Sequence, residues 1–231
     1  MRSAGCTFND LIDRNIDAEV ARTKTRPLAK GEISPRQALL FFCLQCLGGL
    51  AVLVSLPRRC WPLSLVGLAL LVLYPFMKRI THWPQLVLGF AFNLGVIFGA
   101  VAVAPYQALN WPAVLSLYGA GIAWTMGYDT IYALQDKEDD LKIGVKSTAI
   151  RFGNHVRLAL SACYGIMFAL LGNVGYSAKG GIVYYGLMGF CAAVTAYRLY
   201  DLNPHDTNDC QKAFNANSSL GWLVWGALLT V

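Results

Sequence analysis

Charged side chains are scarce in this chain of 231 residues. Only 14% of the residues are Asp, Glu, Lys or Arg and 56% are hydrophobic, whereas a soluble domain is about 25% charged. Five or more long stretches are almost free of charge, and an α-helix needs about 20 such residues to cross a bilayer. The shortage of charge therefore predicts an all-α polytopic membrane protein. The absence of strand-type alternation argues against a membrane barrel.

Other absences narrow the class further. The sequence contains no nucleic-acid-binding motif, and membrane topology accounts for the net charge of +6. The seven cysteines have no paired spacing, which argues against a disulfide framework and suits a reducing compartment. Cys43 and Cys46 form a C-x-x-C inside an apolar stretch, where packing is expected rather than metal or redox chemistry. The histidines stand alone near the ends of apolar stretches, at His82, His155 and His205.

Seven apolar stretches are the predicted membrane spans. They cover residues 37–56, 62–77, 84–104, 112–134, 155–173, 180–200 and 218–231. Pro, Asn and Trp mark several of their boundaries, as expected near a membrane surface. The last stretch ends before about 20 apolar residues are complete, so we expect an incomplete seventh helix.

Basic residues are concentrated on one side of the predicted membrane. When the loops are numbered alternately, 16 of the 19 Lys and Arg fall on the side that holds the N-terminal segment. The remaining three are Arg58, Arg59 and Lys179. The positive-inside rule places the basic side in the cytoplasm or the mitochondrial matrix. All 13 acidic residues lie on or next to the same side, and because acids contribute little to orientation, they indicate a polar site.

An acidic segment near the N-terminus has helical spacing. Asn9, Asp13 and Asp17 are four residues apart, which places them on one face of a helix. Like charges at this spacing destabilise an isolated helix, and carboxylates close to hydrocarbon are costly unless a cation holds them. The alternative is that these are hydrated loop acids paired with nearby bases.

A second acidic segment lies more than a hundred residues later on the same predicted side. Asp129, Asp136 and Asp140 are seven and four residues apart, which again predicts one helical face. The two segments, residues 10–19 and 129–140, together hold nine of the 13 acidic residues, and such a match favours a shared cation site over two independent hydrated loops.

The ligands on offer are carboxylate and amide oxygens, which favour Mg²⁺, Ca²⁺ or Mn²⁺ over zinc or copper. Mg²⁺ usually takes one or two carboxylates and completes its shell with water and phosphate oxygens. Two facing arrays therefore suit Mg²⁺ ions with a diphosphate between them. Three bases near the arrays, Arg22, Arg26 and Lys146, suit the remaining phosphate charge.

These residues carry a resemblance to a known family. Residues 9–17 (NDLIDRNID), with the bases that follow them, resemble the first aspartate-rich motif of the UbiA superfamily of membrane prenyltransferases. Residues 136–140 (DKEDD) resemble the second motif. The sequence around the motifs, at residues 127–153 and 74–95, resembles that of the 4-hydroxybenzoate polyprenyltransferase branch. The resemblance extends from residue 5 to about residue 221.

The resemblance implies a single transmembrane prenyltransferase domain over residues 1–231, with a UbiA-like helix bundle around a central cavity. The family has nine helices, so we expect that about seven are present and that the N-terminal helices are missing. The motifs imply catalytic carboxylates at Asp13, Asp17, Asp136 and Asp140. The implied Mg²⁺ ligands are these four with Asn9 and Asp129. The implied substrate-binding residues are Asn9, Arg22, Arg26, Lys146, Lys78 and Arg79.

The implied reaction is Mg²⁺-dependent transfer of a polyprenyl group from polyprenyl diphosphate to the ring of 4-hydroxybenzoate, an early step of ubiquinone biosynthesis. Lys78 and Arg79 are the candidates for the carboxylate of the aromatic acceptor, although both also suit interfacial anchoring. The resemblance implies a multi-pass protein of the mitochondrial inner membrane with active-site loops facing the matrix, or alternatively of the bacterial plasma membrane. Other ubiquinone-biosynthesis proteins are the implied partners.

Several alternatives stay open from sequence. One is a UbiA-type enzyme with a different aromatic acceptor, and another is a catalytically inactive truncated form. A CDP-alcohol phosphotransferase also uses aspartate arrays, but its D-G-x-x-A-R text does not occur here. A divalent-cation transporter would place its polar groups at mid-membrane, whereas these acids lie at the ends of spans.

Overall fold

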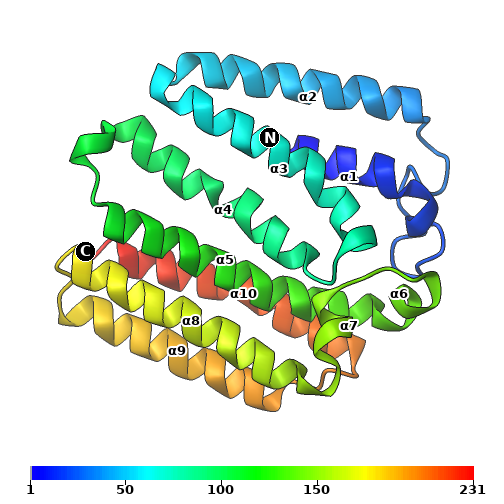
Figure 1. Cartoon of the computed structure of the whole chain (residues 1–231). Helices are drawn as coiled ribbons and strands as arrows, with labels where there is room; N and C mark the ends of the chain where they lie inside the picture. The colour runs from blue at the N-terminus through cyan, green and yellow to red at the C-terminus, as the bar shows by residue number, and fades with distance from the viewer. Residues whose placement is uncertain (1) are drawn as a thin grey trace.

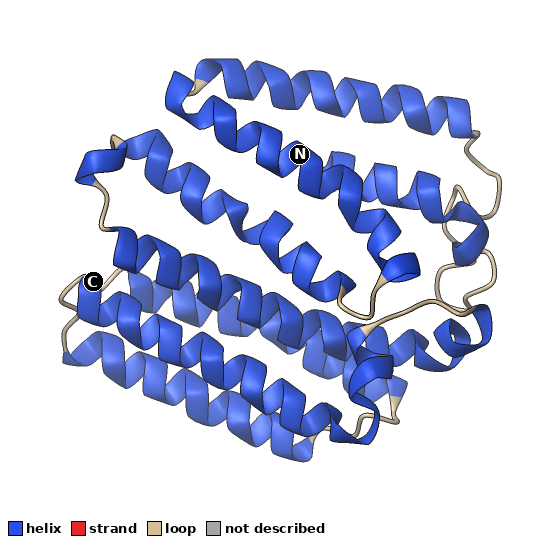
Figure 2. Cartoon of the chain, viewed as in Figure 1, coloured by secondary structure: helices blue, strands red, loops and turns tan. Residues whose placement is uncertain are grey.

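The computed structural model describes residues 2–231, and every regular element within that range is helical (Figure 2). Met1, the first residue of the predicted domain, and the side chain of Arg2, which the count of bases included, lie outside the described part. The long helices are α1 (Arg2–Asp17), α2 (Pro35–Ser55), α3 (Trp61–Ile80), α4 (Pro84–Val103), α5 (Trp111–Ala133), α8 (Val156–Ser177), α9 (Ile182–Asp201) and α10 (Thr207–Leu228). The short elements are η1 (Arg58–Cys60), η2 (Tyr106–Ala108), η3 (Leu134–Asp136), α6 (Lys137–Ile143), α7 (Thr148–Phe152) and η4 (Gly153–His155).

Six of the predicted spans are confirmed as long helices, namely α2, α3, α4, α5, α8 and α9. Within residues 2–231, five segments are long and apolar enough to cross a membrane by length and composition. They are Pro35–Ser55, Arg58–Ile80, Pro84–Val103, Thr148–Ser177 and Ile182–Asp201. Helices α5 and α10 are of similar length but are not among these five segments. The all-α polytopic architecture predicted from the shortage of charge is therefore confirmed.

The last helix begins earlier than predicted. The sequence placed its start at residue 218, where the apolar residues begin, but α10 starts at Thr207. The Asp206 side chain caps this end, because its Oδ1 accepts the backbone N–H of Asn208 at 2.8 Å and of Asp209 at 3.4 Å. Hydrophobicity marks where a helix lies in lipid, whereas the cap marks where the backbone turns helical. The predicted start was therefore wrong.

The bundle has two halves (Figure 1). Helices α5, α8, α9 and α10 form one compact half, and α1, α2 and α3 form the other, with α4 between them. The buried core belongs to the first half, where Leu160, Leu171, Tyr184 and Val224 are almost fully enclosed. Helix α2 is the outermost helix, and most of its large apolar side chains are exposed, as expected for contact with lipid.

Hydrogen bonds between side chains join α5 to its neighbours. The Asn93 side chain of α4 donates to the Thr125 hydroxyl at 2.9 Å, and Asn173 of α8 donates to Ser116 at 2.7 Å. Such bonds between apolar helices are a common source of specificity in membranes. Helix α5 thus occupies the centre of the bundle and carries one of the acidic segments at its C-terminal end.

Candidate active site

The two acidic segments meet at one end of the bundle. The end of α1, the segment 18–34, the last turn of α3, and the α5–η3–α6 junction surround a cavity of about 150 Å³. Of the eleven predicted site residues, nine line it: Asn9, Asp17, Arg22, Arg26, Lys78, Asp129, Asp136, Asp140 and Lys146. Asp13 and Arg79 are outside the lining but contact each other beside it. Segments far apart in sequence therefore form one polar site.

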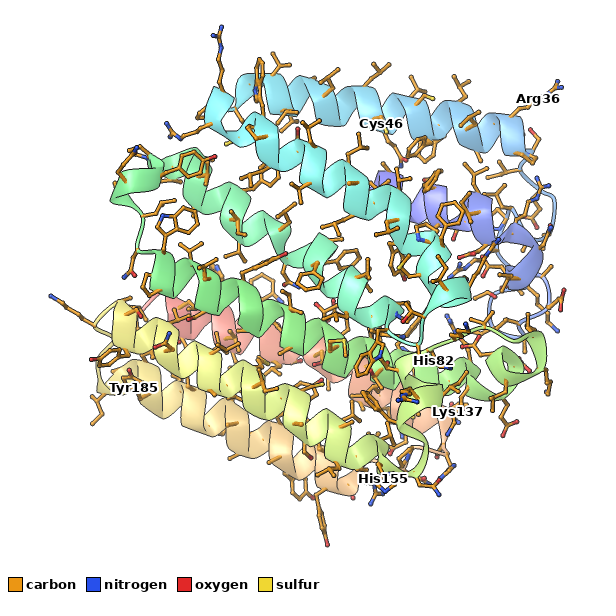
Figure 3. The ribbon with its side chains drawn as sticks, viewed as in Figure 1. Arg36, Cys46, His82, Lys137, His155 and Tyr185 are labelled. Carbon is orange, nitrogen blue, oxygen red and sulfur yellow. The ribbon has the colours of Figure 1, made fainter. Side chains whose placement is uncertain are left out.

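Figure 3 places the site relative to the rest of the molecule. Arg36, His82, Lys137 and His155 lie toward the same end of the bundle as the cavity, and Tyr185 lies toward the opposite end. Neither His82 nor His155 takes part in the cavity lining. The basic end of the molecule and the polar cavity therefore coincide, as the asymmetry of charge predicted.

The first acidic segment is helical, as predicted. Asn9, Asp13 and Asp17 lie on α1, and the side chain of Asp13 is completely buried. Its partner comes from α3, which continues to Ile80 instead of ending at residue 77 and so carries Lys78 in its last turn. The Lys78 ammonium lies 2.6 Å from Asp13 Oδ2 but off the hydrogen-bonding direction.

The second acidic segment does not form the single helical face that was predicted. Helix α5 ends at Ala133, the 3₁₀ turn η3 follows, and α6 starts at Lys137. The tighter turn rotates the chain differently from an α-helix, so the seven-residue spacing alone does not set the direction of Asp136. Asp129, Asp136 and Asp140 nevertheless all line the cavity.

Ion pairs join the acids to the predicted bases. The Arg22 guanidinium holds the Asp136 carboxylate through Nε, at 2.8 Å from Oδ1, and through Nη2. Arg26 Nη1 donates to Asp10 Oδ1 and to Asp17 Oδ2, at 2.9 Å each. The segment 18–34 therefore neutralises carboxylates of both motifs.

The remaining predicted bases differ in their access to the cavity. Arg79 donates to the Ile12 carbonyl at 2.9 Å and lies 3.5 Å from Asp13, away from the lining. Lys78 lines the cavity, whereas Arg79 does not. Lys146 Nζ donates to the Ile80 carbonyl at 3.1 Å, and its backbone N–H donates to the Lys78 carbonyl at 2.8 Å.

Burial raises the pKa of carboxyl groups at the site. It raises the pKa of Asp140 to about 6, with a smaller contribution from the Asp136 charge. Burial also raises the pKa of Asp13, and the neighbouring Lys78 opposes that shift. Asp139 differs because it accepts the Ala21 backbone N–H at 3.1 Å, which lowers its pKa. Asp140, which lines the cavity, is therefore a carboxyl group whose charged form a nearby cation would stabilise.

Three lining or linking residues were missed from sequence. Tyr132 lines the cavity, and its hydroxyl accepts from Arg22 Nη1. Gln85 also lines it and accepts the Thr148 backbone N–H at 3.1 Å. The Asp139 carboxylate accepts a hydrogen bond from the Ala21 backbone N–H. Tyr132 lies four residues before Asp136, a spacing that could have indicated a shared side of the chain.

The arrangement can bind a cation and an anion together. Among residues 2–231, no three His, Cys, Asp or Glu side chains are gathered as a ready-made metal site, because bases hold the carboxylates. Two carboxylates suffice for Mg²⁺, which takes its other ligands from water and phosphate. The donor set of this cavity, carboxylate oxygens beside guanidinium and ammonium groups, fits Mg²⁺ with a diphosphate. The predicted metal ligands stay a prediction.

Comparisons with known proteins agree with this geometry. The UbiA prenyltransferase family matches residues 1–223. Proteins of Drosophila melanogaster and Homo sapiens are 45% and 41% identical over 225 residues, and each is named 4-hydroxybenzoate polyprenyltransferase, mitochondrial. Each match covers 97% of this chain but only 57% and 60%, respectively, of the relative. The chain therefore spans little more than half the length of these relatives.

Solved structures share the fold. An apo UbiA homolog from Aeropyrum pernix K1 superimposes with a TM-score of 0.80 at 27% identity, over 99% of this chain and 84% of that one. A digeranylgeranylglyceryl phosphate synthase structure gives a TM-score of 0.71 at 21% identity, over 97% and 78%. The second likeness shows the arrangement of helices and nothing beyond it.

Proposed function

Because the chain belongs to the UbiA prenyltransferase family, we propose that it transfers a polyprenyl group from polyprenyl diphosphate to the ring of 4-hydroxybenzoate, as an early step of ubiquinone biosynthesis. One observation carries the proposal: carboxylates of both motifs and four bases line a single cavity at one end of a membrane bundle. The names of the relatives support the choice of acceptor.

The cavity suits the diphosphate end of the donor. Arg22, Arg26, Lys78 and Lys146 line it, and guanidinium and ammonium groups are strong ligands for phosphate oxygens. Asp17, Asp129, Asp136 and Asp140 supply the hard oxygens that Mg²⁺ prefers. When bound there, Mg²⁺ would act as a Lewis acid that stabilises the charge developing on the departing diphosphate.

The residues of the chain have separate roles in this reaction. Arg22, Arg26 and Lys146 take the charge of the diphosphate as the allylic C–O bond breaks. Lys78 binds the carboxylate of 4-hydroxybenzoate and orients the ring carbon ortho to the phenol oxygen toward the allylic carbon. The new C–C bond forms at that ring carbon, which then loses its proton. The apolar interior of the bundle keeps water away from the allylic cation.

We place the protein in the mitochondrial inner membrane with the cavity facing the matrix. The relatives are named mitochondrial, and the basic residues lie at the cavity end of the bundle. Its partners on this proposal are the lipid bilayer and the two substrates. Association with other ubiquinone-biosynthesis proteins is part of the same proposal.

The function is tested with membranes that contain the protein, a polyprenyl diphosphate, 4-hydroxybenzoate and Mg²⁺. We expect prenylated 4-hydroxybenzoate, and we expect Asp136→Ala to lower the rate by at least about a hundredfold, since it removes a carboxylate that would hold the Mg²⁺ on which the leaving diphosphate depends. Lys142→Ala, at an exposed position of α6, is the matched control and should keep the rate.

Two outcomes would contradict the proposal in different ways. Product formation with another aromatic acid but not with 4-hydroxybenzoate would change the acceptor and keep the reaction class. No product from any acceptor, in protein that is folded and inserted in the membrane, would exclude prenyl transfer by this chain.

A further inference from the structure

Tyr132 contacts the site more closely than its sequence position suggested. It lies in the last turn of α5, and the Arg22 guanidinium carbon is 4.3 Å from the centroid of its ring. Arg22 Nη1 also donates to the Tyr132 hydroxyl, while Nε and Nη2 hold Asp136. A single guanidinium is therefore fixed by a ring, a hydroxyl and a carboxylate.

A second aromatic residue supports Tyr132 from α10. The ring of Phe214 lies 4.8 Å from that of Tyr132 between centroids, and Phe214 also contacts Tyr128 at 6.1 Å. Helix α10 carries no charged residue in the cavity lining. It is linked to the site through this aromatic contact, which extends from Phe214 through Tyr132 to Arg22.

The contacts of Arg22 differ in whether they survive metal binding. Mg²⁺ bound to an Asp136 oxygen would compete with Arg22 for that carboxylate. The ring and hydroxyl of Tyr132 do not compete with a metal, and an arginine retains its stacking on an aromatic face while its other donors are free. Arg22 lies in the non-helical segment 18–34, where no helix backbone fixes its direction.

We propose that Tyr132, supported by Phe214, is a positioning residue that keeps Arg22 facing the cavity when Asp136 is released to bind a metal. Arg22 is then ready to bind the diphosphate. This inference rests on the proposed function because it takes the ligand to be a diphosphate. It assigns to Tyr132 an effect on phosphate binding that acts through Arg22 alone.

The test is a double-mutant cycle on Tyr132 and Arg22 in the full chain. Binding of inorganic diphosphate in the presence of Mg²⁺ is measured by calorimetry on purified protein in nanodiscs. We expect Tyr132→Leu to weaken the affinity about tenfold and Tyr132→Phe to weaken it about threefold, because the ring remains. In an Arg22→Ala background, Tyr132→Leu should have no further effect.

Steady-state kinetics give a second measurement. Tyr132→Leu should raise the KM for polyprenyl diphosphate and leave the KM for 4-hydroxybenzoate unchanged. Phe214→Leu should shift the first KM in the same direction by a smaller factor. Tyr118→Leu is the matched control, because Tyr118 is on the same helix and donates to the Phe90 carbonyl at 3.0 Å, away from the cavity lining.

Additive effects of Tyr132→Leu and Arg22→Ala would overturn the inference, and so would unchanged affinity in both Tyr132 variants. If Tyr132→Leu does not fold, the cycle with Tyr132→Phe decides by the same criterion. A parent protein that binds diphosphate but forms no prenylated product contradicts the proposed function and leaves this inference standing. A parent protein that binds no diphosphate overturns the inference.

Discussion

At the scale of single residues, the buried ion pair of Asp13 and Lys78 is the most consequential contact of the site. Asp13 is fully buried, the Lys78 side chain is 22% exposed, and their charged atoms lie 2.6 Å apart. A buried pair adds little net stability over apolar residues, but removing one partner leaves a buried charge without compensation. The pair therefore makes the end of α3 depend on α1.

Replacing Lys78 with Met should lower the free energy of unfolding by about 3 kcal/mol, because buried Asp13 then keeps, among the described residues, only Arg79, at 3.5 Å, as a cationic partner. Adding Asp13→Asn should restore much of this loss. Lys142→Met, which breaks an exposed pair with Asp139 at 3.2 Å, is the control and should cost about 0.5 kcal/mol or less. Unfolding in detergent is the measurement, and equal losses for the two lysines would contradict the expectation.

At the scale of elements, α5 determines where the second motif lies. It packs against α4, α8 and α10 and delivers Asp129 and Tyr132 to the cavity. It comes very close to α8 at Gly127, where an added Cβ would lie 2.8 Å from the Tyr164 ring. Tyr164 is buried and donates to Asn217 of α10 at 2.8 Å, so the ring cannot easily move aside.

Gly127→Ala should destabilise the bundle by about 1–3 kcal/mol, since the added methyl group forces α5 and α8 apart. It should also lower the affinity for Mg²⁺ with diphosphate, because the shift reaches Asp129 two residues later. Gly189→Ala on α9 has nothing within 4 Å of the new Cβ and should be neutral. The measurement is the thermal unfolding midpoint of the two variants in nanodiscs. Equal midpoints would show that α5 adapts without cost.

At the scale of the whole molecule, charge and fold agree on orientation. The cavity and the basic residues Arg36 and Lys137 lie toward one end of the bundle, while Arg58 and Lys179 belong to connections at the opposite end. The orientation rule depends on this asymmetry of Lys and Arg. On the proposed function, the diphosphate and the aromatic carboxylate would therefore both bind from one side of the membrane.

Lys142→Cys and Lys179→Cys should react with a membrane-impermeant maleimide from opposite sides of the bilayer. In inverted and right-side-out vesicles, only one of the two should be labelled in each preparation, above the level of the parent chain with its own cysteines. Labelling of both positions from the same side would refute the predicted topology.

The sequence by itself determined the helical membrane class, six of the long helices and the helical face of the first motif. These predictions depend only on neighbouring residues. The number of consecutive apolar residues determines whether a helix can span the bilayer, and four-residue spacing places side chains on one face of a helix. The family resemblance supplied the pairing of the two motifs.

Only the tertiary structure decided which bases hold which acids. Arg22 meets Asp136 across more than a hundred residues, and Tyr132 belongs to the site through its contact with Arg22. The start of α10 at Thr207 depends on the Asp206 cap, which hydropathy does not record. Spacing along one helix fixes direction only within that helix, whereas contacts between segments depend on how the whole bundle packs.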